Sequence, residues 1–412
     1  MKLSNSTKKI LLKSTSLLRT DPVGVRLGMV ALIIGTIAGL LAGIVLGSYT
    51  NKLIELPGLI LLVPAAVGLR GNIYGALASR LNTIAQLGEY RFSIKKSTTV
   101  GANIYASILL SLSASMLLAV VAKFVAISFD VTNSISILEF FIISVIGGIV
   151  PTAIVLLCTI FLSKLCVRRN WDLDNVAAPL ITAIGDSVTI PSLLIASLLL
   201  PNSFVIMTLG IIVFVISVLT IIMGIWSNIE LVKRIVRESL PVLIIGGSVS
   251  ILAGLAIQSK ISSFDKFPIL LVLLPPMLSI NGAIGSILSA RVATKLHLGF
   301  VDANKFKFSN VSEDITVSYL LTIPIFTMLG IFCAIFSIFG HLSGPGWFYI
   351  ITISLVAGFI ATTFSNFVGY LSATLTYRFG FDPDNIAVPS VTSMSDLIGA
   401  VVLMSVISLL PI

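Results

Sequence analysis

The stretch DLDNVAAPLITAIGDSVTIP, from Asp172 to Pro191, returns near the C-terminus as DPDNIAVPSVTSMSDLIG, from Asp382 to Gly399. At an offset of 210 residues, the matched pairs are Asp172 and Asp382, Asp174 and Asp384, Asn175 and Asn385, Pro179 and Pro389, Thr182 and Thr392, and Asp186 and Asp396. Each copy places two carboxylates at the start of an apolar run and one carboxylate deep inside it. Because a carboxylate within an apolar membrane span is costly, Asp186 and Asp396 are the first candidates for function.

The composition predicts an all-α polytopic membrane protein. The 412 residues are 57% hydrophobic and only 10% charged, with a mean hydropathy of +1.10. Soluble domains have about 25% charged residues, so this class is excluded. The net charge of +9 lies in short loops between apolar runs, so we expect a lipid bilayer and no nucleic acid as partner. The three cysteines show no metal-binding or disulfide spacing.

The apolar runs predict eleven membrane-spanning helices. The expected spans are 24–49, 54–87, 98–127, 136–163, 175–199, 203–226, 237–258, 267–296, 310–340, 346–376 and 385–410. The second and eighth are longer than a simple crossing needs, so each is expected to break at its glycines or to project into the cytosol. The predicted parts are a basic N-terminal segment (1–23), a first five-helix repeat (24–200), a linker helix (201–235) and a second five-helix repeat (236–412).

The positive charges predict the orientation. With the N-terminus inside, 19 lysines and arginines lie in inner segments, 4 lie in outer segments, and 3 lie within spans. We therefore expect a cytoplasmic N-terminus, an extracytoplasmic C-terminus and a plasma membrane location. Because the linker helix restores the orientation of the second repeat, the repeats are expected to be parallel. They would be related by a pseudo-two-fold axis along the membrane normal. Such a chain is a single-chain pseudo-dimer, and whether it assembles further stays open.

A second motif recurs in the same order. VPAAVGLRGNIYGALASRLNT (63–83) is followed by LPPMLSINGAIGSILSARVAT (274–294) at an offset of 211. Gly71 matches Gly282, and we expect such glycines to allow close backbone approach or a broken helix. Asn72 follows Gly71 but Asn281 precedes Gly282, so the two amides do not match. Both asparagines are candidates to line a polar path.

The two motifs, each present twice, resemble the membrane domain of the MgtE-type magnesium transporters. The resemblance covers about residues 24–411 and is strongest to the solute carrier 41 branch, in which that domain is duplicated in one chain. It implies that the second and fifth helices of each repeat line a central pathway. It also implies that the intramembrane aspartates, here Asp186 and Asp396, bind the transported cation.

The chemistry of these residues suits Mg²⁺, which is a hard cation that gives up its waters reluctantly. We expect Asp186 and Asp396 to hold a hydrated ion through its water shell, with Thr182, Thr392 and Ser395 as further oxygens. The alternative is that the aspartates only pack helices together. Six polar residues form a predicted inner vestibule, in which helix capping is an equal and compatible interpretation: Asp172, Asp174, Asn175, Asp382, Asp384 and Asn385. Because the proposed site contains no histidine or cysteine, softer ions are disfavoured.

Several alternatives stay open. Glu313 and Asp314 open the ninth span, and their counterparts at offset 211 are Ala102 and Asn103. This one-sided acidic pair is either a helix cap or a second-ion or proton-coupling site. Transport is compatible with a channel, a uniporter, or an exchanger or exporter coupled to Na⁺. An intramembrane aspartyl protease also needs two membrane aspartates. It would place them in different motifs, and because the sequence shows no other catalytic constellation we expect no enzyme.

Overall fold

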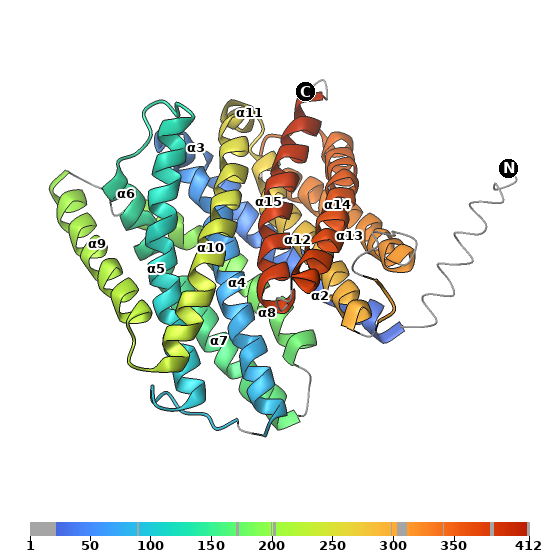
Figure 1. Ribbon diagram of the computed structural model, residues 1–412. Helices are drawn as coiled ribbons and strands as arrows, with labels where there is room; N and C mark the ends of the chain where they lie inside the picture. The colour runs from blue at the N-terminus through green and yellow to red at the C-terminus, as the bar shows by residue number, and fades with distance from the viewer. Residues whose placement is uncertain are drawn as a thin grey trace, which may run out of the picture.

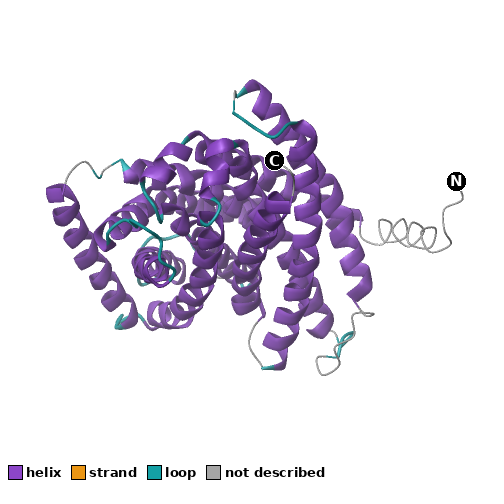
Figure 2. Cartoon of the chain, turned by 90° about the horizontal axis from the view of Figure 1, so that it is seen from above, coloured by secondary structure: helices purple, strands orange, loops and turns teal. Residues whose placement is uncertain are grey.

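The computed structural model describes residues 22–88, 90–169, 173–198, 200, 203–297, 299–302, 311–340, 342–379 and 383–409. The predicted N-terminal segment lies outside these residues except for its last two. All regular secondary structure in the described ranges is helical (Figures 1 and 2). The helices are α2 (Pro22–Ser48), α3 (Thr50–Glu55), α4 (Leu59–Gln86), α5 (Thr99–Ser128), α6 (Ile137–Phe141), the π-helix η1 (Ile142–Ile146), α7 (Gly147–Arg169), α8 (Leu173–Ser197), α9 (Ser203–Ile225), α10 (Glu230–Gln258), α11 (Ile261–Lys266), α12 (Ile269–His297), α13 (Ser312–Phe339), α14 (Trp347–Arg378) and α15 (Pro383–Leu409).

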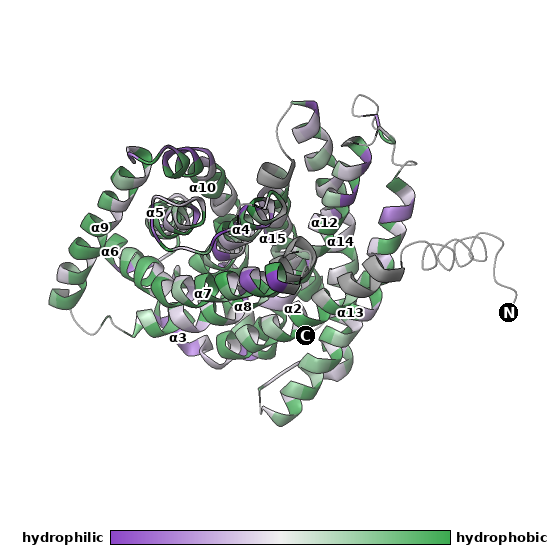
Figure 3. Ribbon diagram, turned by 90° about the horizontal axis from the view of Figure 1, so that it is seen from below, coloured by the Kyte–Doolittle hydropathy of each residue, from purple (hydrophilic) through white to green (hydrophobic). Residues whose placement is uncertain are grey.

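The helices confirm a polytopic membrane protein. Ten of them, within the described residues, are long and apolar enough to cross a membrane. The described part of α2 adds the shorter apolar stretch Leu32–Ser48. The outside of the bundle is largely apolar (Figure 3). The exact count of eleven crossings stays a prediction.

Four predicted spans differ from the observed helices. The second and eighth spans each divide into a short helix and a long one, α3 with α4 and α11 with α12. Neither α4 nor α12 breaks at its glycines. The fourth span contains the π-helical turn η1 ahead of Pro151, which lies inside α7 and lacks a backbone donor. The seventh span begins at Glu230, before the apolar run, because charged side chains pair along this helix. Arg234 Nε lies 2.9 Å from Glu238 Oε1.

The two halves of the chain exchange their first helices. α2 packs against α12 of the second half, and α10 packs against α4 of the first half. Small residues allow these crossings. A Cβ added at Gly43 would meet the backbone of Val272, and one added at Gly254 would meet the backbone of Leu61. Both members of each pair are related by the offset of 211, so the same contact is made twice with the halves interchanged. This is the packing expected around a pseudo-two-fold axis.

The helix α9 lies at the edge of the bundle (Figures 1 and 2). It packs mainly on α5 and α6. Only 22% of its most apolar stretch is buried, against 83% for α12, so α9 contributes little to the core. The short helices α3 and α11 contact each other at the end of the bundle that also holds the C-terminus (Figure 1). The central helices are therefore α4, α8, α12 and α15, with α2 and α10 crossing between the halves.

Candidate functional site

The second and fifth helices of each half meet at paired glycine and threonine residues. In the first half, a Cβ added at Gly71 of α4 would lie 3.4 Å from Thr182 Cγ2 of α8. In the second half, a Cβ added at Gly282 of α12 would lie 3.6 Å from Thr392 Cγ2 of α15. Both distances are ordinary van der Waals contacts, so a side chain would fit at either position. Neither structural role predicted for these glycines, close backbone approach or a broken helix, is observed there.

Polar contacts cross from one half to the other at the same level. The Thr392 hydroxyl on α15 donates to Asn72 Oδ1 on α4, at 3.3 Å, and also to the carbonyl of Pro389, at 3.1 Å. The described residues show no matching contact from Asn281, because its side chain faces α14. Its Oδ1 accepts a hydrogen bond from Thr362 at 3.4 Å. The difference follows from the sequence, since the two asparagines lie on opposite sides of their glycines.

Each intramembrane aspartate lies against the other half of the chain. The Asp186 side chain on α8 is 2% exposed and has Ser279 of α12 beside it. The Asp396 side chain on α15 accepts a hydrogen bond at Oδ2 from Ser250 of α10, at 2.9 Å. A Cβ added at Gly68 of α4 would lie 3.5 Å from this same oxygen. Each carboxylate therefore faces the second helix of the opposite repeat.

The two carboxylates are also close enough to interact electrostatically. One oxygen of the pair, Asp186 Oδ2, is buried and accepts no hydrogen bond from any described residue. The buried Ser395 hydroxyl, next to Asp396, likewise makes no hydrogen bond within the described chain. A buried carboxylate oxygen without a donor is unfavourable. The arrangement therefore suits a positively charged or hydrogen-bonding species between the two aspartates.

The donor set favours a cation that keeps its water. Among the described residues, no group of three or more histidine, cysteine, aspartate or glutamate side chains converges on one point. Two carboxylates with hydroxyl and amide oxygens nearby are a poor cage for a dehydrated soft metal. They are a suitable set for a hydrated Mg²⁺, which is usually bound through one or two carboxylates.

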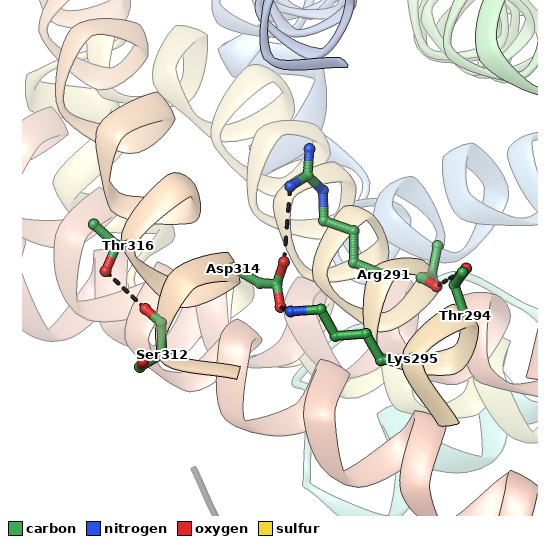
Figure 4. Close-up of polar contacts among 7 residues, drawn as sticks. Arg291, Thr294, Lys295, Ser312, Asp314 and Thr316 are labelled. Atoms are coloured by element: carbon green, nitrogen blue, oxygen red, sulfur yellow. Dashed lines mark hydrogen bonds and ion pairs between the residues drawn. The ribbon is translucent and has the colours of Figure 1, made fainter. Parts of the chain in front are cut away.

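The acidic residues at the start of α13 form a separate cluster (Figure 4). Asp314 is buried, and Arg291 and Lys295 of α12 both point at its carboxylate. Lys295 Nζ lies 2.5 Å from Asp314 Oδ2, and Arg291 Nη1 lies 3.7 Å from Asp314 Oδ1. Glu313 is exposed. The corresponding contact in the first half has a neutral acceptor, because Arg80 Nε of α4 donates to Asn103 Oδ1 of α5 at 2.8 Å.

The structure brings together only part of the predicted site. Eight of the predicted residues lie along the four central helices: Asp186, Asp396, Thr182, Thr392, Gly71, Gly282, Asn72 and Ser395. Asn281 faces away into the second half, and Asn103, Glu313 and Asp314 lie elsewhere. The predicted vestibule cannot be placed: Asp172 and Asp382 lie outside the described residues, as do the side chains of Asp174, Asn175, Asp384 and Asn385.

Sequence reasoning assigned no role to three polar residues beside the site. Ser250 bonds Asp396 and Ser279 lies beside Asp186, and each serine occupies a position where the other repeat has glycine. Arg70 of α4 is fully buried. Its guanidinium donates to the carbonyl of Ala66 at 2.9 Å and to the Ser115 hydroxyl at 3.1 Å. Comparing the repeats for polar residues on one side only would have found the two serines, whereas Arg70 corresponds to another polar residue, Asn281.

This arrangement of duplicated apolar helices, with an aspartate inside each repeat, is typical of a membrane transporter. A family model described as "MgtE: Divalent cation transporter" matches the chain twice, over residues 63–196 and 274–406. The chain therefore belongs to the MgtE family of divalent cation transporters.

Similar proteins come from the solute carrier family 41, as the two sequence motifs predicted. Member 3 from Mus musculus is 24% identical over 368 residues, which is 84% of this chain and 74% of the mouse protein. Member 2 from Xenopus laevis is 25% identical over 377 residues, which is 83% of this chain and 64% of that protein. No solved structure is significantly similar. These relatives are solute carriers, which favours transport over the aspartyl protease alternative.

Proposed function

We propose that the protein transports Mg²⁺ across the plasma membrane along its pseudo-two-fold axis. Asp186 and Asp396 bind the ion in the middle of the path, and α4, α8, α12 and α15 line it. The path runs between the halves of a single-chain pseudo-dimer. The N-terminus lies in the cytoplasm, as the distribution of lysine and arginine predicts.

The observation that carries this proposal is that each aspartate contacts the opposite repeat. Each carboxylate comes from the fifth helix of one repeat and faces the second helix of the other. Asp186 lies against Ser279, and Asp396 lies against Gly68. Aspartates that only packed helices within a repeat would not need to contact the opposite repeat. Membership of a divalent cation transporter family supports the same conclusion.

The ion is bound through its water shell. With both carboxylates ionised, the pair supplies two negative charges, which match the charge of Mg²⁺. Water molecules on the ion donate hydrogen bonds to the carboxylates, including the oxygen Oδ2 of Asp186 that has no donor from the described chain. Thr182, Thr392 and Ser395 provide further acceptors. Binding through water is weak enough to allow release, which transport requires.

The test is Mg²⁺ flux into proteoliposomes that contain purified protein. We compare wild type with Asp186→Asn, Asp396→Asn and the double variant. Asp130→Asn, which makes the same chemical change at an exposed residue, is the matched control. Flux should vanish in the double variant and persist in the control. Undiminished flux in a correctly folded double variant would refute the paired-aspartate path.

The same assay distinguishes the second candidate, an exchanger coupled to Na⁺. A cluster of neutral oxygens in the second repeat favours it, because its amide, Asn366, corresponds to Val155 in the first repeat. There the Ser318 hydroxyl donates to Asn366 Oδ1 at 2.8 Å, and Thr322 bonds Thr362 at 3.3 Å. An exchanger would move Mg²⁺ only when a Na⁺ gradient drives Na⁺ in the opposite direction. A channel or uniporter would carry Mg²⁺ without a Na⁺ gradient.

A further inference from the structure

The serines beside the two aspartates come from positions that do not match in the repeats. Asp396 Oδ2 accepts a hydrogen bond from Ser250 of α10, at 2.9 Å, and Ser279 of α12 lies beside Asp186. At the offset of 211, Ser250 corresponds to Gly39 and Ser279 corresponds to Gly68. Each serine is therefore matched by a glycine in the other repeat. The hydroxyl next to the carboxylate comes from a different helix position in each case.

Steric space explains why Asp186 takes its hydroxyl from α12. A Cβ added at Gly39 of α2 would lie 2.6 Å from Cα of Pro276, which is too close for any side chain. The residue that corresponds to Pro276 in the first repeat is Ala65. α2 therefore has no room for the counterpart of Ser250, and the hydroxyl must come from position 279.

Asp396 has room for a neighbouring hydroxyl at both position 250 and position 68. A Cβ added at Gly68 would lie 3.5 Å from Asp396 Oδ2 and 4.0 Å from Ser250 Oγ. Both are ordinary van der Waals distances. A serine at position 68 would therefore place its hydroxyl next to the same carboxylate oxygen that Ser250 now bonds. The chain thus offers a way to move the hydroxyl from one helix to another without changing its target.

We propose that Ser250 and Ser279 are positioning residues of the cation site. This rests on the proposed function of the two aspartates. A serine hydroxyl is both a donor and an acceptor. Without the ion, each hydroxyl donates to its aspartate and fixes the orientation of that carboxylate. With a hydrated Mg²⁺ bound, the same oxygen accepts a hydrogen bond from the water shell.

The experiment measures the KM for Mg²⁺ flux in proteoliposomes for Ser250→Ala, Ser279→Ala and the relocated double variant Ser250→Ala with Gly68→Ser. Ser248→Ala is the matched control, because that hydroxyl lies on the same helix and donates only to its own backbone, at the Ile244 carbonyl. A hydrogen bond to a charged group is worth roughly a tenfold change in an equilibrium constant. We therefore expect each single variant to raise KM by roughly tenfold.

The relocated variant separates positioning from a general structural role. Gly68→Ser should return the KM of Ser250→Ala to within about threefold of wild type, whereas a packing defect at position 250 would persist. Failure of this rescue in a folded protein, or an unchanged KM in both single variants, would overturn the proposal. If the double aspartate variant still abolishes flux in that case, only this inference fails. If it does not, the proposed function itself fails.

Discussion

The crossing of α10 over α4 makes a sharp prediction about Gly254. A Cβ at this position would lie 2.6 Å from Cα of Leu61 and 2.7 Å from its carbonyl oxygen. Both atoms belong to the backbone, so they cannot rotate away. Since ordinary contact begins near 3.4 Å, Gly254→Ala must push the two helices apart by about 0.8 Å.

The expected cost follows from that displacement. A gap of 0.5–1 Å forfeits roughly a quarter to a half of each dispersion contact it opens. Overpacking of this kind costs about 1–3 kcal/mol. The intrinsic helix preference of alanine over glycine returns about 1 kcal/mol. We therefore expect a net loss of up to about 2 kcal/mol and a thermal unfolding temperature lower by up to about 2 °C.

The matched control is Gly35→Ala on α2, where an added Cβ meets nothing within 4 Å. Only the helix preference applies there, so this variant should be slightly more stable than wild type. Both proteins are measured by thermal unfolding in the same detergent, together with Mg²⁺ flux. The reasoning fails if Gly254→Ala proves as stable as Gly35→Ala.

Three further predictions concern buried charges and the ion. Arg70→Met should stabilise the protein by about 1–3 kcal/mol, because no described carboxylate forms an ion pair with this buried guanidinium; a lower unfolding temperature would reveal an anionic partner. Asp314→Asn should destabilise by about 1–3 kcal/mol by leaving Lys295 without its partner, and a double-mutant cycle with Lys295→Met should give a coupling energy above about 1 kcal/mol. Mg²⁺ at one hundred times its Kd should stabilise wild type by about 2.7 kcal/mol. The variant with both Asp186→Asn and Asp396→Asn should show no such shift in its unfolding curve.

The sequence predicts the repeat and its two aspartates because both depend on a simple register. A uniform offset places Asp186 and Asp396 at equivalent depths in equivalent helices, whatever the helices contact. These features need only the chain order and the helical period.

The exchange of the first helices was beyond the reach of the sequence. Gly43 and Gly254 are visible as small residues, but their partners Val272 and Leu61 lie on the opposite repeat. Small residues indicate that a helix approaches another closely and do not say which one. The π-helical turn before Pro151 is also set by local packing rather than by a readable pattern.

The two kinds of contact between the repeats play different parts. Contacts between glycine and backbone repeat with the halves interchanged, as Gly43 and Gly254 show, so they impose a two-fold scaffold. The serines beside the aspartates do not repeat: Asp396 is bonded by Ser250, and Ser279 lies beside Asp186. A duplicated chain can change its side chains independently in each half, which a true homodimer cannot. Along the transport path proposed above, the ion would therefore meet two carboxylates that occupy equivalent sequence positions but have different neighbours.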